Sequence, residues 1–274
     1  MVALPGYHIA DMENARPLAL VTGASSGIGA TFARHLAAEG YNLVLVARRT
    51  DRLEELAADL RARHGIEAAT LTADLTLDGD VERVAARLSG AADLALLVNN
   101  AGFGTKGLFF EADAAQQDAM HRLHVLATER LTRAALPGMI ARGRGGVINV
   151  SSVAAFIQGP SNISYCATKA WMNSFTRGLA MELQLLGSPV RVQALCPGYT
   201  YSEFHDVMQV NRGEIPKGWW LDADFVVAES LRALKGGQVI VVPSFRYHAL
   251  MWVLKVIPDW LFRLGAKRYR KVRR

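Results

Sequence analysis

Short apolar runs alternate along the chain with longer segments in which apolar residues recur every three or four positions. The apolar runs predict strands at 18–22, 42–46, 68–72, 94–98, 146–151, 190–195 and 238–242. The periodic segments predict helices at 27–39, 51–63, 79–89, 115–141, 164–186 and 223–235. Near-continuous apolar strands such as 94–98 are typical of a parallel sheet buried on both faces. The pattern therefore predicts an α/β fold with a single doubly wound parallel sheet and helices on both faces.

The alternation continues to residue 244 without a linker or an internal repeat. Gly236 and Gly237 are a suitable stop for the last periodic helix before the last strand. We therefore expect one domain over residues 1–244, followed by an amphipathic, basic C-terminal extension over 245–274.

Composition is consistent with this division. The chain has 274 residues, is 51% hydrophobic and has a net charge of +6. Nine of the 31 Lys and Arg residues and one acid, Asp259, follow residue 244, so the extension carries +8 and the rest −2. Because the positive charge is confined to the extension, the sequence argues against a nucleic-acid-binding protein.

The extension allows two interpretations. Its first apolar stretch, of about ten residues, is too short to span a bilayer. Trp260, Leu261 and Leu264 then precede a basic cluster, which is the composition of a helix lying on an anionic membrane. The alternative is a helix that packs on a partner subunit. We expect no secretory signal at the N-terminus, and Cys166 and Cys196 give no disulfide framework, so we expect a cytoplasmic protein that is peripheral to a membrane if the first interpretation holds.

A glycine-rich loop follows the first predicted strand. Its motif, TGASSGIG at 22–29, lies between that strand and a predicted helix. Backbone N–H groups at such a helix start bind phosphate, and glycines let the backbone approach it. The alternative is a plain strand-to-helix turn. The residues expected to surround a dinucleotide pyrophosphate are Gly23, Ser25, Ser26, Gly27, Ile28 and Gly29.

The end of the second strand predicts which dinucleotide binds. Ala47 stands where an acid would bond an adenosine ribose 2′-hydroxyl, and Arg48 and Arg49 follow it. Guanidinium groups pair well with phosphate, and Ser25 adds a hydroxyl donor. We expect NADP(H) rather than NAD(H); the alternative is that the two arginines are solvated surface residues.

Tyr165 and Lys169 lie four residues apart on a predicted helix, and Ser152 precedes them by thirteen. An ammonium one turn away favours the phenolate and would lower the pKa of the tyrosine toward the range of a general acid. A serine hydroxyl nearby can donate a hydrogen bond to a carbonyl oxygen. We expect these three residues to be catalytic.

Six motifs occur in a fixed order: TGASSGIG at 22–29, Asp74 in ADLT, NNAG at 99–102, Ser152 in NVSS, YCATK at 165–169 and CPGYTYSEF at 196–204. In these motifs the chain, from about residue 17 to about 243, resembles the short-chain dehydrogenase/reductase family, which has a Rossmann-like fold. The resemblance implies NAD(P)-dependent reduction of a carbonyl or oxidation of an alcohol. It implies that Tyr165 is the acid/base, that Ser152 orients the carbonyl, and that Lys169 binds the nicotinamide ribose and tunes the tyrosine.

The resemblance implies further residues of the cofactor site. Asp74 would bond the adenine amine, with a cap on the next helix as the alternative, and Thr200 would contact the carboxamide. The remaining residues implied are Leu75, Asn99, Asn100, Ala101, Gly102, Pro197, Gly198 and Ser202, with Tyr165 and Lys169 themselves. It also implies a homodimer or homotetramer through the helices at 115–141 and 164–186, with Leu123, Leu126, Leu131, Trp171, Phe175 and Leu179 as apolar contacts.

His124 departs from the family pattern. The family usually has an asparagine at this place in the long central helix, where it helps to hold a water that links the lysine to solvent. An imidazole can also bind a water, and its protonation depends on pH. We therefore include His124 among the expected catalytic residues, with simple packing in the helix as the alternative.

The stretch from about 203 to 221 has no clear period and contains Phe204, Met208, Val210, Ile215, Trp219 and Trp220. It resembles the family's substrate lid, and its apolar content indicates a hydrophobic substrate, unless the aromatic residues only pack the loop down. No metal-ligand grouping is present. We expect an NADPH-dependent reductase of a hydrophobic ketone or aldehyde such as a 3-oxoacyl thioester. The alternatives are a steroid or xenobiotic carbonyl reductase and a non-catalytic, membrane-docked NADPH-binding protein.

Overall fold

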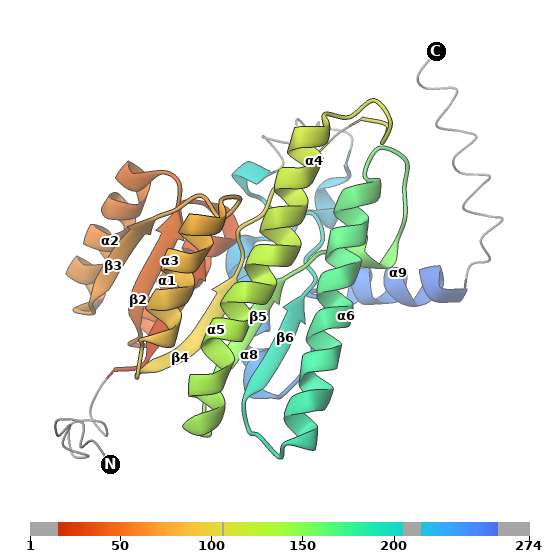
Figure 1. Cartoon of the computed structure of the whole chain (residues 1–274). Coiled ribbons are helices and arrows are strands. Elements are labelled where there is room, and N and C mark those ends of the chain that lie inside the picture. The colour runs from red at the N-terminus through yellow and green to blue at the C-terminus, as the bar shows by residue number, and fades with distance from the viewer. Residues whose placement is uncertain (1–15, 106, 205–214, 257–274) are drawn as a thin grey trace.

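The computed structural model describes residues 16–105, 107–204 and 215–256. Its centre is a seven-stranded parallel sheet in the order β3-β2-β1-β4-β5-β6-β7 (Figure 1). The strands are β1 (Leu18–Thr22), β2 (Asn42–Ala47), β3 (Ala68–Thr72), β4 (Leu94–Asn99), β5 (Gly146–Val150), β6 (Arg191–Leu195) and β7 (Ile240–Val241). The predicted α/β fold with one doubly wound sheet is therefore confirmed.

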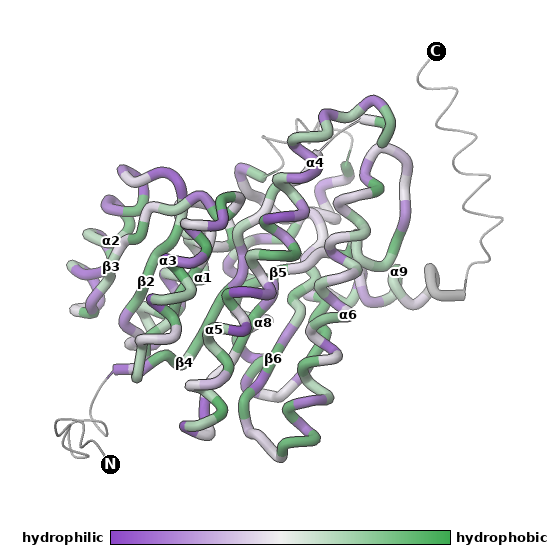
Figure 2. The backbone as a smooth tube through the Cα atoms, viewed as in Figure 1, coloured by the Kyte–Doolittle hydropathy of each residue, from purple (hydrophilic) through white to green (hydrophobic). Residues whose placement is uncertain are grey.

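Alternating side chains of each central strand enter two different cores. In β1, Ala19 and Val21 join the core beneath one set of helices, whereas Leu18 and Leu20 join the core on the opposite face. This explains why the strand shows no polar face in the sequence. Figure 2 shows the same arrangement, with hydrophobic strands between helices that alternate between hydrophobic and hydrophilic residues.

Helices cover both faces of the sheet. The first core is closed by α1 (Gly27–Ala38), α2 (Thr50–His64) and α8 (Ala223–Lys235). The second is closed by α3 (Asp78–Ser89), α5 (Thr128–Ala141) and α6 (Ile163–Leu185). No helix among the described residues is long and apolar enough to cross a membrane.

The long helix predicted at 115–141 is interrupted. It consists of α4 (Ala114–His121), a π-helical turn η2 (Arg122–Ala127) and α5. A π-turn inside an α-helix adds one residue to a turn and is frequent at functional sites. The spacing of apolar residues in the sequence does not reveal this turn, because one additional residue in a helical turn barely alters that spacing. The turn contains His124, so it fixes where that imidazole points.

Part of the expected subunit contact faces inward. Leu123 and Leu131 are buried in the core beneath α5, and Leu179 packs against the same core. Leu126 is 40% exposed. Trp171 and Phe175 of α6 stack on each other with ring centroids 4.8 Å apart, and both are partly exposed. The outward set is therefore reduced to Leu126, Trp171 and Phe175.

A further helix, α9 (Phe245–Val256), follows β7. Tyr247 is 2% exposed and belongs to the core beneath α1, α2 and α8, and Met251 is also buried. The expected domain boundary at 244 thus falls before a helix that is packed on the domain. This packing is not evident from the sequence, because Tyr247 and Met251 lie within a stretch whose apolar residues fit a membrane face equally well.

Candidate active site

The candidate site lies along the edge where the parallel strands end. β1 and β4 are neighbours in the sheet, although the chain continues from β1 to β2, which lies on the other side of β1. The loops after β1 and β4 therefore lead to opposite faces of the sheet. Such a switch point leaves a crevice in which α/β proteins bind ligands. The loops after β1, β2, β4, β5 and β6 carry most of the predicted site residues.

The glycine loop after β1 is closely packed against the loop after β4. Gly23 has φ +66°, and a Cβ on Gly29 would lie 2.3 Å from the carbonyl oxygen of Gly23. Asn100 Nδ2 donates to the carbonyl oxygens of Thr22 (2.8 Å) and Gly23 (3.3 Å). The side chain of Asn100 therefore holds the glycine loop in place. The backbone at the start of α1 stays accessible, as the close approach of a pyrophosphate requires.

Thr22, which was not singled out from the sequence, completes this connection. Its Oγ1 accepts hydrogen bonds from the backbone N–H groups of Asn100 (2.9 Å) and Ala101 (3.0 Å). A hydroxyl at the end of one strand thus fixes the loop of its neighbour. The only feature of the sequence that points to Thr22 is its place as the first residue of the glycine motif.

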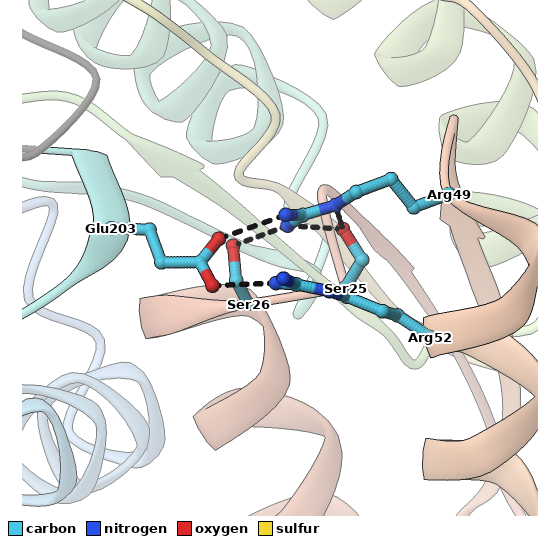
Figure 3. Close-up of polar contacts among 5 residues, drawn as sticks. All are labelled: Ser25, Ser26, Arg49, Arg52 and Glu203. Carbon is cyan, nitrogen blue, oxygen red and sulfur yellow. Dashed lines mark hydrogen bonds and ion pairs between the residues drawn. The ribbon is translucent and has the colours of Figure 1, made fainter.

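Arg49 lies at the centre of a polar cluster over the glycine loop (Figure 3). Its guanidinium donates to Ser25 Oγ at 3.0 and 3.2 Å and to Ser26 Oγ at 3.0 Å. Arg49 Nη1 also donates to Glu203 Oε2 at 2.9 Å, and Arg52 Nη1 donates to Glu203 Oε1 at 2.5 Å. The two arginines hold the pKa of the Glu203 carboxyl below its usual value. Neither Arg52 nor Glu203 was identified from the sequence.

Arg48 is more exposed and points toward Asp74, with 3.9 Å between its Nη1 and Asp74 Oδ2. Asp74 Oδ1 accepts from the backbone N–H (3.0 Å) and the hydroxyl (2.8 Å) of Thr76. Oδ1 thus stabilises the turn that leads into α3, which favours the helix-cap alternative for this oxygen. The other oxygen, Oδ2, faces Arg48. Leu75, by contrast, is buried in the core.

Ser152, Tyr165 and Lys169 come together beside the end of β5. Ser152 begins the 3-10 turn η3 (Val153–Phe156) and accepts a hydrogen bond from the N–H of Ala154. A hydrogen bond links its side chain to Tyr165, and this bond acts to lower the pKa of the phenol. Lys169 is buried, its Nζ donates to the carbonyl oxygen of Val150 at 2.7 Å, and it lies 5.8 Å from the centroid of the Tyr165 ring.

The predicted effect of Lys169 on Tyr165 is corrected by the structure. Burial raises the pKa of Tyr165 to about 12, and this outweighs the hydrogen bond from Ser152. Burial also lowers the pKa of Lys169 to about 7, so its charge is only partial at neutral pH. Desolvation is therefore the largest cause of both pKa shifts, and the spacing of the motif does not reveal it.

His124 is fully buried, and both its ring nitrogens have protein partners. Its Nε2 accepts from the N–H of Phe103 at 3.2 Å, and its Nδ1 lies 2.9 Å from Thr168 Oγ1. Because the Thr168 hydroxyl donates to the carbonyl oxygen of Tyr165, Nδ1 must carry the proton and donate to Thr168. The imidazole is thus neutral, with its pKa held well below the usual value by burial and by Lys169. These contacts favour the packing interpretation.

The loop after β6 lies over the glycine loop. Thr200 is buried and donates to the carbonyl oxygen of Gly198, and Ser202 Oγ donates to the carbonyl oxygen of Thr200. The Cβ of Ser202 lies 3.0 Å from the place where a Cβ on Gly27 would stand. The other predicted residues border these contacts: Ile28 packs on the core, Ala101 packs on the opposite core, Gly102 lies against the His124 ring, and Pro197 accepts from Val153.

The aromatic residues of the predicted lid divide into two groups. Phe204 lies beside Tyr165, with 5.9 Å between the ring centroids of the two residues. Trp220 is buried and stacks on Tyr201, and Trp219 packs edge-on against Tyr247. The two tryptophans therefore hold the loop down, as the alternative interpretation proposed. Met208 and Val210 lie outside the described residues.

Both cysteines are buried thiols without a disulfide, and burial raises the pKa of each. A raised pKa lowers the thiolate fraction, which argues against a reactive role for Cys166 beside Tyr165. No group of three or more potential metal-ligating side chains was found among the described residues.

Comparisons with known proteins agree with this geometry. A family model described as short chain dehydrogenase matches residues 17–212. A very-long-chain 3-oxoacyl-CoA reductase from Pyrenophora tritici-repentis is 34% identical over 189 residues, which is 67% of this chain but only 55% of the relative. A short-chain dehydrogenase from Sphingobium yanoikuyae, solved with NADPH, is 34% identical with a TM-score of 0.80, covering 88% of this chain and 96% of that one. A bulky-bulky ketone specific alcohol dehydrogenase from Comamonas testosteroni is 30% identical with a TM-score of 0.75, covering 93% of each chain.

Proposed function

This chain belongs to the short-chain dehydrogenase/reductase family, and we propose that it is an NADPH-dependent reductase of a hydrophobic ketone or aldehyde, with a long-chain 3-oxoacyl thioester as the first substrate to test. The observation that carries the proposal is the assembly of Ser152, Tyr165 and Lys169 at the same sheet edge as the glycine loop.

The residues present fit the cofactor. A pyrophosphate would lie on the backbone of the glycine loop, where Gly23, Gly27 and Gly29 have no side chain. A 2′-phosphate would lie near Arg49, whose contacts with Ser25 and Ser26 preposition the guanidinium. Lys169 would bind the ribose on the nicotinamide side. When bound, NADPH supplies the hydride that adds to the carbonyl carbon.

The chain supplies the proton and the orientation. The Ser152 hydroxyl donates a hydrogen bond to the carbonyl oxygen, and the Tyr165 phenol transfers its proton to that oxygen as negative charge develops on it. Because the raised pKa keeps the phenol protonated at neutral pH, Tyr165 is ready to act as an acid. This protonation state suits reduction better than oxidation.

The preference for a hydrophobic substrate rests on Phe204 beside Tyr165 and on the names of the relatives. Each buried methylene contributes about 0.8 kcal/mol to binding, so two or three additional methylenes amount to about tenfold or more in affinity. We expect kcat/KM to rise at least about tenfold from a four-carbon to a long-chain 3-oxoacyl-CoA, measured by the loss of nicotinamide absorbance.

Tyr165→Phe tests the mechanism. It keeps the ring but removes the transferable proton, so turnover should fall by about 10²-fold or more while NADPH binding, measured by calorimetry, stays intact. Tyr41→Phe is the matched control, since Tyr41 is also a half-buried tyrosine with a raised pKa, at the end of α1 away from the site. Wild-type turnover in Tyr165→Phe would disprove the mechanism, and NADPH binding without turnover on any carbonyl would favour the non-catalytic alternative.

A further inference from the structure

Glu203 is placed where a ligand anion would be expected. Arg49 and Arg52 lie one turn apart at the start of α2, and each donates to a different oxygen of the Glu203 carboxylate (Figure 3). Ser25 and Ser26 complete the cluster by accepting from Arg49. Two guanidinium groups around two hydroxyls form an arrangement that binds phosphate well.

The charges of the cluster do not balance. Arg49 and Arg52 bring two positive charges and Glu203 one negative charge, so a positive charge remains. A phosphate monoester carries about −1.5 to −2 charges at neutral pH and has three acceptor oxygens, so it would satisfy both arginines better than one carboxylate does. Each Ser hydroxyl that accepts from Arg49 keeps its own O–H for donation to such a group.

The contact between Glu203 and the arginines is also replaceable. The side chain of Glu203 is 44% exposed, and those of Arg49 and Arg52 are 41% and 44% exposed. Ion pairs this open to water contribute little because solvent screens them. A stronger anion can therefore displace the carboxylate at small cost.

We propose that Glu203 occupies the position of the cofactor's adenosine 2′-phosphate and competes with it, so that this one carboxylate sets how strongly the site prefers NADPH to NADH. The proposal rests on the proposed function. NADPH must displace Glu203 before its phosphate reaches Arg49 and Arg52. NADH has a neutral 2′-hydroxyl, which can donate to the carboxylate and leaves it in place.

The displacement is transmitted toward the catalytic residues. The base of the Glu203 segment is fixed, because Tyr201 N–H donates to Leu221 O at 3.0 Å and Leu221 N–H donates to Tyr199 O at 2.8 Å. Beyond that base, Glu203 is followed directly by Phe204, whose ring lies against Tyr165. When Glu203 leaves the arginines, residues 202–204 turn about the fixed base and Phe204 moves off the phenol. Binding at the adenosine end thus clears the place where the carbonyl binds.

Two adenosine ligands test the proposal without turnover. Adenosine 2′,5′-bisphosphate carries the 2′-phosphate and adenosine 5′-monophosphate does not, and both lack nicotinamide. In the full-length protein, Glu203→Gln should tighten the bisphosphate about 3–10-fold by calorimetry and change the monophosphate less than about twofold. Asp78→Asn is the matched control, since Asp78 also pairs with two arginines, Arg122 and Arg130, beneath the opposite face of the sheet, and it should alter neither ligand.

Hydrogen exchange supplies the second measurement. In the wild type the bisphosphate, but not the monophosphate, should speed amide exchange in the peptide that covers 202–204, and Glu203→Gln should show the faster exchange without ligand. If Glu203→Gln leaves the affinity for the bisphosphate unchanged or weakens it, the phosphate binds without displacing Glu203 and the proposal is overturned. If the wild type binds both ligands equally, the preference for NADPH in the proposed function fails as well, so the two failures are distinguishable.

Discussion

At the scale of single residues, the protonation of Tyr165 predicts which direction of the reaction is favoured. Burial raises the pKa of the phenol to about 12, so the group is an acid throughout the neutral range. A proton donor acts below its pKa, and a proton acceptor acts above it. Reduction should therefore be insensitive to pH until the phenol ionises at alkaline pH.

The reverse reaction should behave oppositely. Alcohol oxidation needs the phenolate, whose fraction grows about tenfold per pH unit below the pKa. We expect kcat/KM for oxidation to rise steadily from neutral to alkaline pH while kcat/KM for reduction stays level. Initial rates in both directions across that range check this. A reduction rate that falls as pH rises through about 7 would instead assign the control to Lys169, whose pKa is lowered to that value.

His124 gives a second prediction. His124→Asn can keep the donor to Thr168 but removes the acceptor for the N–H of Phe103, and His124→Gln has the reverse effect. Each leaves a buried polar group without its partner, so each should lower the free energy of unfolding by about 1–3 kcal/mol.

The pH–rate profile separates the two interpretations of His124. A buried imidazole with a pKa held well below the ordinary value does not titrate near neutrality, so neither variant should change the profile near neutral pH. Denaturant unfolding and pH profiles of both variants provide the measurements. A shifted profile with unchanged stability would restore the water-relay role.

Sequence and structure differ most where residues far apart in the chain meet. Tyr165 and Lys169 could be identified because their spacing follows from helix geometry, and Ser152 because it precedes Tyr165 by only thirteen residues in the family's order of motifs. Glu203 could not, because nothing in the sequence indicates that the residue lies beside Arg49, which precedes it by 154 positions. Burial, which determines both pKa values at the catalytic pair, is likewise a property of the assembled fold.

At the scale of elements, α6 carries two groups of residues on different faces. One face carries Tyr165 and Lys169, and another carries the stacked, partly exposed rings of Trp171 and Phe175. An aromatic pair on the outside of a helix is well suited to an interface. A rigid α6 would then connect subunit contact directly to the catalytic residues.

We therefore expect at least a dimer, and we expect Phe175→Glu to weaken it. A carboxylate at this contact must be desolvated without a partner, which is costly in an interface. Light scattering at micromolar concentration should show a smaller mass for Phe175→Glu than for the wild type. Phe225→Glu, at a 42% exposed phenylalanine on α8 beneath the other face, should leave the mass unchanged. A monomeric wild type would contradict the prediction.

The helix α9 connects the segment after residue 244 to the loop after β6. The Tyr247 hydroxyl donates to the carbonyl oxygen of Trp219 at 2.7 Å and accepts from the N–H of Tyr199 at 3.0 Å. Its ring also fills the space above Gly198, where any Cβ would collide with it. The helix therefore supports the loop after β6, which carries Thr200 and Glu203.

At the scale of the whole molecule, the fold was predictable because a parallel sheet imposes one pattern on every strand. Continuous apolar strands separated by amphipathic helices indicate two buried faces, and the strands lie close to where the pattern put them. The sequence indicates less clearly which elements pack against one another. The attachment of α9 depends on the burial of Tyr247 and Met251 and on two hydrogen bonds between the Tyr247 hydroxyl and the backbone of the connection between β6 and α8.

The attachment of α9 also determines how the basic extension should be tested. Removal of all residues after 244 would take away Tyr247 and disturb the loop after β6. A cut after Val256 keeps α9 and removes residues 257–274, which lie outside the described part of the chain. They contain seven Lys and Arg residues and one acid.

If this segment binds a membrane surface, each basic residue contributes about 1 kcal/mol near anionic lipid, and salt weakens the attraction. Full-length protein should then co-sediment with phosphatidylserine-containing vesicles, less at high salt and not with neutral phosphatidylcholine vesicles. The chain cut after Val256 should stay in solution with unchanged NADPH affinity, because the cofactor residues and Tyr247 remain. Equal sedimentation of both forms would disprove membrane binding by the segment. A change in oligomer mass or thermal stability on truncation, without vesicle binding by either form, would show that it packs on a partner subunit.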